Sequence, residues 1–132
     1  MRNDLRAGRM PMQKVDIPLR LPGLNEYINE CRTNKFGAAA MKRETEDSIG
    51  WFIKRLPAFE RPVIVHFTWI EKDRKRDLDN IAFAKKFIFD ALVKFGKLKG
   101  DGQKYVIGFT DHLEHGSATM VKIEIEETNA KG

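Results

Sequence analysis

The sequence is poor in cysteine, and Cys31 is the single one. One cysteine cannot form a disulfide within one chain, so a disulfide-stabilised secreted fold is excluded and a reducing, cytoplasmic compartment is expected. No catalytic context surrounds Cys31, and we interpret it as a half-buried structural thiol. An ordinary hydrophobic core therefore has to stabilise the fold, and the 42% of hydrophobic residues can supply one.

Long apolar runs and several well-known catalytic motifs are also missing. No segment is long and apolar enough to span a bilayer, and the first residues carry charges without the apolar stretch of a secretory signal. There is no Walker A loop, nucleophile elbow, paired CxxC motif or RNA-recognition aromatic signature. These absences predict no membrane partner and no small-molecule cofactor, and they leave P-loop and serine-hydrolase chemistry without support.

Positive charge is present, and it is unevenly distributed along the chain. The net charge is +5, and residues 72–104 contain ten Lys or Arg and five Asp, so this segment carries the whole excess. A localised basic field is typical of a protein that binds a polyanion, most often nucleic acid. Charge alone leaves a solvated surface as an equal alternative.

Hydrophobic patterning predicts one domain at 14–127, between a flexible arm at 1–13 and a frayed C-terminus at 128–132. Strands are expected at 14–21, 62–70, 104–113 and 117–127. Helices are expected at 24–34, 36–56 and 79–96. The order β-α-α-β-α-β-β predicts a mixed α/β (α+β) domain, with a small sheet of about four strands packed with two to three helices.

The patterns also predict how some of these elements pack. The strand at 62–70 is apolar on both faces, which favours a central position covered on at least one side. The strands at 104–113 and 117–127 follow each other closely, which predicts a hairpin joined near 114–117. The helix at 79–96 is apolar around most of its circumference, so it is expected either in the core or in an interface with a partner.

The stretch at 74–87 reads RKRDLDNIAFAKKF and sets two acids inside a basic run. Asp77 and Asp79 lie between a strand and a helix, where an extended backbone would point both carboxylates the same way, about 7 Å apart. Adjacent ionised carboxylates repel unless a cation lies between them, and carboxylate oxygens suit Mg²⁺ or Mn²⁺. In the structural alternative, Asp79 caps the helix and Asp77 is a solvated turn residue.

Asp101 and Lys86 are two further candidates. Gly100-Asp101-Gly102 is a turn in its plain interpretation, but flanking glycines would also let the backbone approach a ligand. Lys86 shares a helix face with Asp79, so it could reach an anion held by the acids, and a solvent lysine is the alternative. Whether Asp101 returns to the acid pair depends on the loop at 97–103.

An ordered set of motifs covers nearly the whole chain. It consists of Pro22-Gly23-Leu24-Asn25, Arg76-Asp77-Leu78-Asp79-Asn80, Phe89-Asp90-Ala91-Leu92, and Asp101 followed by Gln103. Over residues 14–126 this set resembles the RusA family of Holliday junction resolvases, which are common in prophages. The resemblance implies a small α/β homodimer, bacterial or phage-encoded and cytoplasmic, with two active sites facing a four-way DNA junction. It further implies Mg²⁺-dependent phosphodiester hydrolysis, with Mn²⁺ able to substitute, that nicks two strands symmetrically in DNA recombination and repair.

The resemblance also implies roles for individual residues. The family's metal-binding aspartates match Asp77, Asp79 and Asp101, and its catalytic lysine matches Lys86. The spacing between the acid pair and Asp90 is about three residues longer than in the best-known members, which shifts the lysine about 4.5 Å along a helix and leaves Lys85 as the alternative. Contacts to DNA are expected at Asn25, Arg74, Lys75, Arg76, Lys85, Lys97, Lys99 and Lys104.

Two other functions stay open at this point. One is a basic nucleic-acid-binding module without activity, in which the acids serve only as helix caps. The other is a less discriminating nuclease that acts on flaps or forks. In all three cases the partner is nucleic acid.

Overall fold

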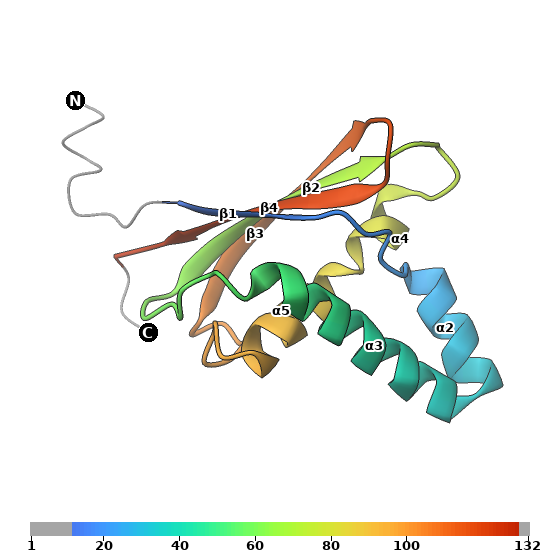
Figure 1. Ribbon diagram of the computed structural model, residues 1–132, viewed down its shortest axis with the longest axis horizontal. Coiled ribbons are helices and arrows are strands. Elements are labelled where there is room, and N and C mark those ends of the chain that lie inside the picture. Colours follow the sequence, from blue (N-terminus) through green and yellow to red (C-terminus); the bar gives the residue numbers. More distant parts are fainter. Residues whose placement is uncertain (1–11, 130–132) are drawn as a thin grey trace.

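The computed structural model describes residues 12–129, so the predicted arm at 1–13 lies outside it except for Met12 and Gln13, and so do residues 130–132 (Figure 1). The elements in chain order are β1 (Gln13–Ile17), α2 (Leu24–Thr33), α3 (Lys35–Ile53), β2 (Val63–Glu71), α4 (Leu78–Ala82), α5 (Lys85–Lys94), β3 (Val106–His115) and β4 (Met120–Glu127). This confirms the predicted mixed α/β class and the order of strands and helices, with one helix divided in two. Among the described residues, no helix is long and apolar enough to cross a membrane.

The four strands form one mixed sheet in the order β1-β4-β2-β3. β2 is central, antiparallel to β4 and parallel to β3, and β1 pairs antiparallel with β4 on the outside. The predicted hairpin is wrong, because β2 lies between β3 and β4. The segment α4–α5 crosses over from β2 and returns the chain parallel to it, as parallel pairs require. The chain then passes the end of β2, where Gly116 N–H donates to Glu71 O at 3.1 Å.

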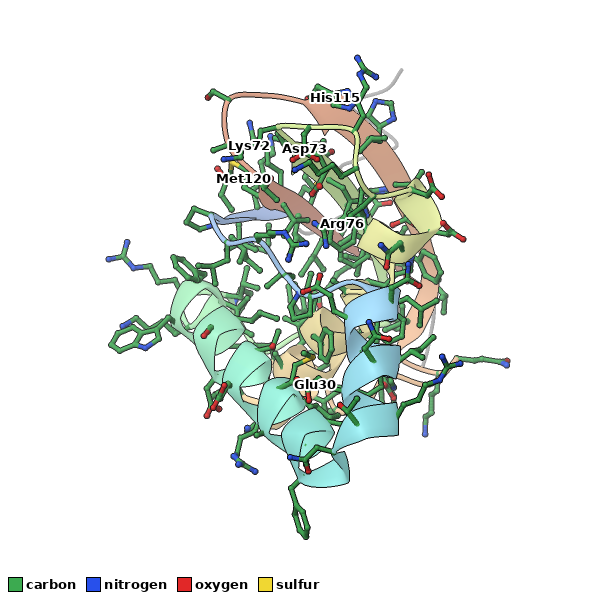
Figure 2. The ribbon with its side chains drawn as sticks, turned by 90° about the vertical axis from the view of Figure 1, so that its right-hand side faces the viewer. Glu30, Lys72, Asp73, Arg76, His115 and Met120 are labelled. Atoms are coloured by element: carbon green, nitrogen blue, oxygen red, sulfur yellow. The ribbon has the colours of Figure 1, made fainter. Side chains whose placement is uncertain are left out.

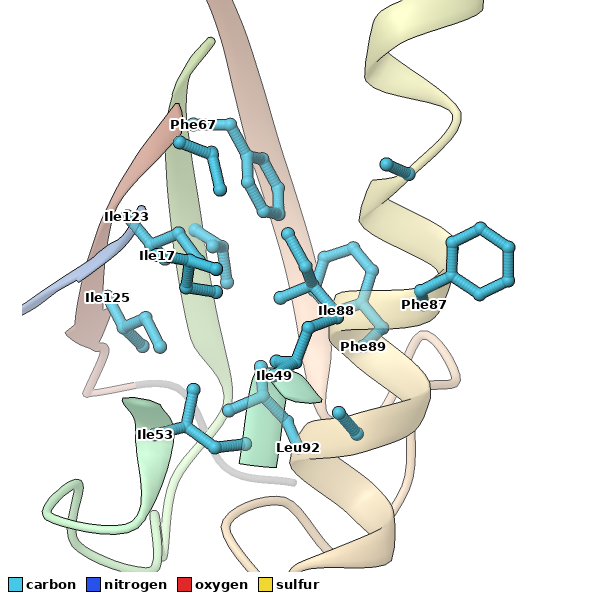
Figure 3. Packing of buried hydrophobic residues seen from close by; sticks show 14 of the residues in the cluster. Ile17, Ile49, Ile53, Phe67, Phe87, Ile88, Phe89, Leu92, Ile123 and Ile125 are labelled. Carbon is cyan, nitrogen blue, oxygen red and sulfur yellow. The ribbon is translucent and has the colours of Figure 1, made fainter. Parts of the chain in front are cut away.

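One face of the sheet is covered and the other is open. Along β2, residues alternate between fully buried and half-buried positions, and Val63, Val65, Phe67 and Trp69 point toward the helices. The helices lie together on this side of the sheet (Figure 1). Figure 3 shows the resulting core, in which side chains of the sheet face those of α3 and α5: Ile17, Phe67, Ile123 and Ile125 on one side, Ile49, Ile53, Ile88 and Leu92 on the other.

The predicted helix at 79–96 is broken at Phe83 and Ala84. Tight backbone bonds from Ala84 N–H to Ile81 O and from Phe87 N–H to Ala84 O mark the turn, at 3.1 and 3.0 Å. The break lets both halves bury apolar side chains, and in α5 Phe87, Ile88, Phe89, Ala91 and Leu92 are buried. Phe87 points away from the sheet and packs against Tyr27 of α2 (Figure 3). Most of the wide apolar surface of this segment is therefore core.

Two smaller predictions are also corrected. Cys31 on α2 is exposed, not half-buried. At the other end of the chain, Thr128 donates from its backbone N–H to Pro62 O at 2.9 Å, so the chain is still anchored just after β4. The predicted frayed end therefore does not begin at this residue.

Candidate functional site

The acid turn, residues 76–80, connects the loop after β2 to α4. Asp77 is the N-cap residue with extended backbone, at φ −73° and ψ 157°, and the helix begins at Leu78. Asp79 therefore lies in the first helical turn, and the expectation that both acids lie in extended backbone is wrong for this residue. Carboxylates are favoured at this end of a helix because of its partial positive charge, so the helix forms one residue earlier than predicted.

The two carboxylates of the acid turn are exposed and largely unengaged. Asp79 Oδ1 accepts a bond from the Asn80 N–H at 2.9 Å. The Asp77 side chain caps nothing, and neither acid pairs with a cation among residues 12–129. Helix capping therefore gives the Asp77 carboxylate no structural task, although Lys72, Arg74 and Lys75 lie just before it.

The acid turn is held in place by the segment just before α2. Asn80 Oδ1 accepts from the Asn25 N–H at 2.9 Å. Gly23 packs so closely that a Cβ there would lie 2.6 Å from Asn80 Oδ1 and 2.9 Å from Asn80 O. A side chain does not fit in that space, which explains the glycine. The motif at 22–25 and the motif at 76–80 thus meet, and Asn25 lies beside the acids.

Arg76 belongs to this support and is not a free cation. Its Nη2 lies 2.8 Å from Glu71 Oε2, and its Nη1 donates to Leu21 O at 3.0 Å. The side chains of Arg76 and Glu71 are only 10% and 7% exposed. Figure 2 shows Lys72 and Asp73 at the outer edge of the loop, with Arg76 closer to the body of the molecule. The predicted role of Arg76 in DNA binding is therefore replaced by an internal ion pair.

Lys86 and Asp101 meet each other, away from the acid turn. Lys86 Nζ lies 3.3 Å from Asp90 Oδ1 and 3.5 Å from Asp101 Oδ2. The Asp90 carboxylate, and more weakly that of Asp101, raise the pKa of Lys86 above its ordinary value, so this lysine is firmly charged. Asp79 lies in α4 and Lys86 in α5, on opposite sides of the break at Phe83 and Ala84. The loop after α5 lies at the opposite end of the α4–α5 segment from the acid turn (Figure 1).

The three predicted metal ligands are therefore not assembled within one chain. Across residues 12–129, no three His, Cys, Asp or Glu side chains form a group that could hold a metal ion. Asp77 and Asp79 fit Mg²⁺ in chemistry, because this ion is often bound by one or two carboxylates together with water and substrate phosphates. Asp101 pairs with Lys86 and does not join Asp77 and Asp79 of its own chain.

Lys85, the alternative lysine, points to a different partner. Its Nζ lies 2.7 Å from Asp111 Oδ2 on β3, and both side chains are 20% exposed. Asp111 Oδ1 also accepts from Trp69 Nε1 at 2.8 Å. This cluster joins α5 to the sheet, and it removes Lys85 from the acid site and from the free phosphate-binding groups. The sequence signal for it was weak, namely that a buried tryptophan N–H needs an acceptor.

The remaining predicted DNA contacts divide into held and free cations. Lys97 Nζ donates to Lys54 O and Leu56 O, at 3.0 and 2.7 Å, and so satisfies carbonyls at the end of α3. Lys99 forms an exposed pair with Glu60 at 3.7 Å, which restrains it little. Arg74, Lys75 and Lys104 form no ion pair in the described chain. Of the predicted DNA contacts, these three thus remain available to a polyanion, and Lys72 beside them is likewise unpaired in the described chain.

Comparisons with known proteins do not assign the chain to a group. No family model matches it, and no curated protein matches its sequence. The class defined by the fold and the site is thus a mixed α/β domain with an exposed acid turn beside a loop of unpaired cations. The resemblance to RusA resolvases rests on the sequence motifs alone.

Proposed function

We propose that the protein is a metal-dependent endodeoxyribonuclease of the RusA type, which resolves four-way DNA junctions by paired symmetric nicks. The observation that carries this proposal is the pair of exposed carboxylates, Asp77 and Asp79, which lack cation partners although unpaired cations lie beside them. In a turn with a purely structural role, the two carboxylates would be expected to form ion pairs with the neighbouring cations. The setting would be DNA recombination and repair in the cytoplasm of a bacterium, from a bacterial or phage gene.

In this proposal each part of the site has its own task. Asp77 and Asp79 would hold Mg²⁺, or Mn²⁺ in its place, and the bound ion would supply an activated water and polarise the scissile phosphate. Lys72, Arg74 and Lys75 would bind the DNA backbone through its phosphates, with little sequence information. Asn25 would contact DNA next to the acids, because its backbone is fixed to the acid turn.

The proposal requires a homodimer for geometric reasons. Asp101 and Lys86 lie away from the acid turn of their own chain, so a second copy would have to bring them to it. Each copy would then complete the site of the other. A dimer also has the two-fold symmetry that paired nicks in a four-way junction require.

Cleavage of a synthetic four-way junction tests the acid pair. Asp79→Asn and Asp77→Asn are each expected to reduce Mg²⁺-dependent nicking at least 100-fold and to leave junction binding unchanged, because the charge lost faces a metal and not DNA. Asp73→Asn is the matched control, since its Oδ1 accepts the Lys75 N–H and an asparagine can do the same. Full nicking by Asp79→Asn would disprove the metal site.

Mixing two inactive variants tests whether the site is shared between copies. If Asp101 acts in the partner's site, a mixed dimer of Asp79→Asn and Asp101→Asn chains has one intact site and nicks one strand. If the three acids act within one chain, the same mixture stays inactive. Each variant alone is expected to be inactive in both cases, so the mixture decides.

The finding that the described residues of one chain assemble no metal-binding group favours a second candidate, a nucleic-acid-binding module without activity. This candidate predicts that the unmodified protein binds the junction and does not nick it in either Mg²⁺ or Mn²⁺. Comparing a junction, a fork and a linear duplex in the same assay separates a resolvase from a general branched-DNA nuclease. Equal cleavage of fork and junction would identify the latter.

A further inference from the structure

The C-terminal part of α3 carries a tryptophan that the core does not use. The side chain of Trp51 is 69% exposed, whereas the other tryptophan, Trp69, is 3% exposed. Phe95, just after α5, is 41% exposed and lies next to it across Gly50. Large exposed aromatic side chains that lie together commonly mark a binding surface.

The fold builds this surface with a close contact between α3 and α5. A Cβ on Gly50 would lie 2.5 Å from Cε2 of Phe95, so the ring packs directly on the backbone of α3. An open hollow of about 430 Å³ results, lined by Asp47, Gly50, Trp51, Lys54 and Phe95. The aromatic side chains are thus held in position before any ligand arrives.

The cations near Trp51 form no ion pair within the described chain, whereas the nearby acid, Asp47, does. Lys54 Nζ lies 4.1 Å from the centre of the Trp51 ring and pairs with no acid of the described chain. Arg55 is exposed and is likewise unpaired within residues 12–129. Asp47 is neutralised by Lys94, whose Nζ lies 3.0 Å from its Oδ1. The surface therefore offers the unpaired charge of Lys54 at the Trp51 ring, with the unpaired Arg55 next to Lys54 in the chain.

Phe109 on β3 provides an internal comparison with the opposite charge balance. It is 50% exposed, and Lys85 Nζ lies 4.6 Å from its ring centre. This lysine is already paired with Asp111 at 2.7 Å. The two contacts thus differ in charge: the lysine over Phe109 is neutralised, and the lysine over Trp51 is not.

We infer that Trp51, Phe95, Lys54 and Arg55, here called the Trp51 platform, bind single-stranded nucleic acid. An unpaired base stacks on the indole of Trp51, and Lys54 leaves the ring to contact the adjacent phosphate together with Arg55. Base stacking on aromatic side chains beside cations is the usual way in which single strands are bound without sequence preference. The platform lies at the C-terminal end of α5, at the opposite end of the α4–α5 segment from the acid turn. It is thus a second nucleic-acid contact, which does not depend on hydrolysis.

Binding of a fluorescent oligodeoxythymidylate tests the platform. Trp51→Ala is expected to weaken binding about tenfold, and Trp51→Phe to restore most of it, because the loss of one stacked base has about this effect. Phe109→Ala is the matched control and is expected to leave the affinity unchanged. Replacing Lys54 and Arg55 by Gln should lower the slope of log affinity against log salt by about 1.4, at about 0.7 per lost phosphate contact.

Tryptophan fluorescence supplies a second readout that a structural effect would not reproduce. The oligonucleotide should quench the exposed Trp51, and Trp51→Phe should still bind while losing the quenching, since Trp69 is buried. Unchanged affinity in Trp51→Ala would overturn the inference, as would a Trp51→Ala variant that loses self-association instead of oligonucleotide binding. Asp79→Asn should leave oligonucleotide binding intact. Failure of the nuclease proposal would therefore appear in junction nicking, and failure of the Trp51 platform in oligonucleotide binding.

Discussion

Two runs of cations lie only ten residues apart in this chain. The fold leaves one run unpaired and pairs the other with acids. Lys72, Arg74 and Lys75 follow β2 and pair with no acid in the described chain. Lys85 and Lys86 begin α5, and both are neutralised, by Asp111 and by Asp90 with Asp101. The local sequence of both runs is equally basic. Of these two runs, only the one in the loop after β2 therefore keeps its cations unpaired.

The difference arises from the path of the chain after α5. The loop at 95–105 brings Asp101 to Lys86, and β3 returns parallel to β2, so that Asp111 lies beside Phe67 and reaches Lys85. Within residues 12–129 the fold brings no acid into an ion pair with the cations of the loop at 72–75. A cation is thus available for binding only where the fold brings no acid to it.

Removing Arg76 should have the largest effect and would sharpen this comparison. Arg76→Ala leaves Glu71 buried without its partner, so the free energy of unfolding should fall by about 3–5 kcal/mol. Arg74→Ala, two residues earlier and exposed, should change it by less than about 0.5 kcal/mol. Urea unfolding followed by circular dichroism measures both. Equal changes in unfolding free energy for the two variants would mean that the ion pair of Arg76 with Glu71 does not stabilise the fold.

Removing the charge of Asp111 should have an intermediate effect. Asp111→Asn keeps an acceptor for Trp69 Nε1 but leaves the half-buried Lys85 without a carboxylate. We expect a loss of about 1.5–3 kcal/mol in unfolding free energy, the range for hydrogen bonds to charged groups. A companion variant, Asp101→Asn, faces an exposed lysine and should cost much less. The comparison fails if both variants unfold at the same urea concentration.

The salt dependence of DNA binding compares the two runs directly. Replacing Arg74 and Lys75 by Gln should lower the slope of log affinity against log salt by about 1.8 on duplex or junction DNA, at about 0.9 per lost phosphate contact. Lys85→Gln should leave the slope unchanged, because its charge is already neutralised within the chain. A loss of slope in Lys85→Gln would show that the paired run contacts DNA as well.

The smallest effect is expected from Lys86 at alkaline pH. Its pKa is raised in the folded state, chiefly by Asp90, so its ion pairs stabilise the fold below pH 10.5 and lose this effect as the pH rises through the raised pKa. The side chain is 58% exposed, and solvent screening limits the contribution to about 0.5 kcal/mol. Lys86→Met should therefore be slightly less stable than the unmodified protein at neutral pH and equally stable at strongly alkaline pH. A difference that persists there would point to lost packing.

The elements were predictable from the sequence because their signals are local. Alternation along 62–70 and the apolar stripe of the segment after residue 78 depend only on neighbouring residues. The pairing of β4 with β2 depends on distant parts of the chain, and the proximity of β3 and β4 in sequence favoured the wrong hairpin. When a strand follows a crossover connection, its own sequence does not show which strand it will pair with.

The candidate site was predictable in part for the same reason. Asp77 and Asp79 were found because their spacing and position beside a strand are visible locally. Arg76 and Lys85 were assigned to DNA because nothing nearby shows Glu71 or Asp111 as their partner. Asp111 lies within β3 on the side that faces the helices, a position that the expected strand at 104–113 does not reveal without its pairing to β2. Partners across the fold decide what each charge does.

The pairing of β1 with β4 has a consequence for synthesis of the protein. β1 pairs with β4 alone, in the register Gln13 to Ile125 and Ile17 to Val121, so the sheet joins the first strand described here to the last. While the ribosome extends the chain, the unit from β2 to β3 can form early, because its contacts are closer in sequence. β1 and the open edge of β2 must wait for residues 120–127. A chain that stalls before this point therefore exposes two unpaired strand edges, which is the state most prone to aggregation.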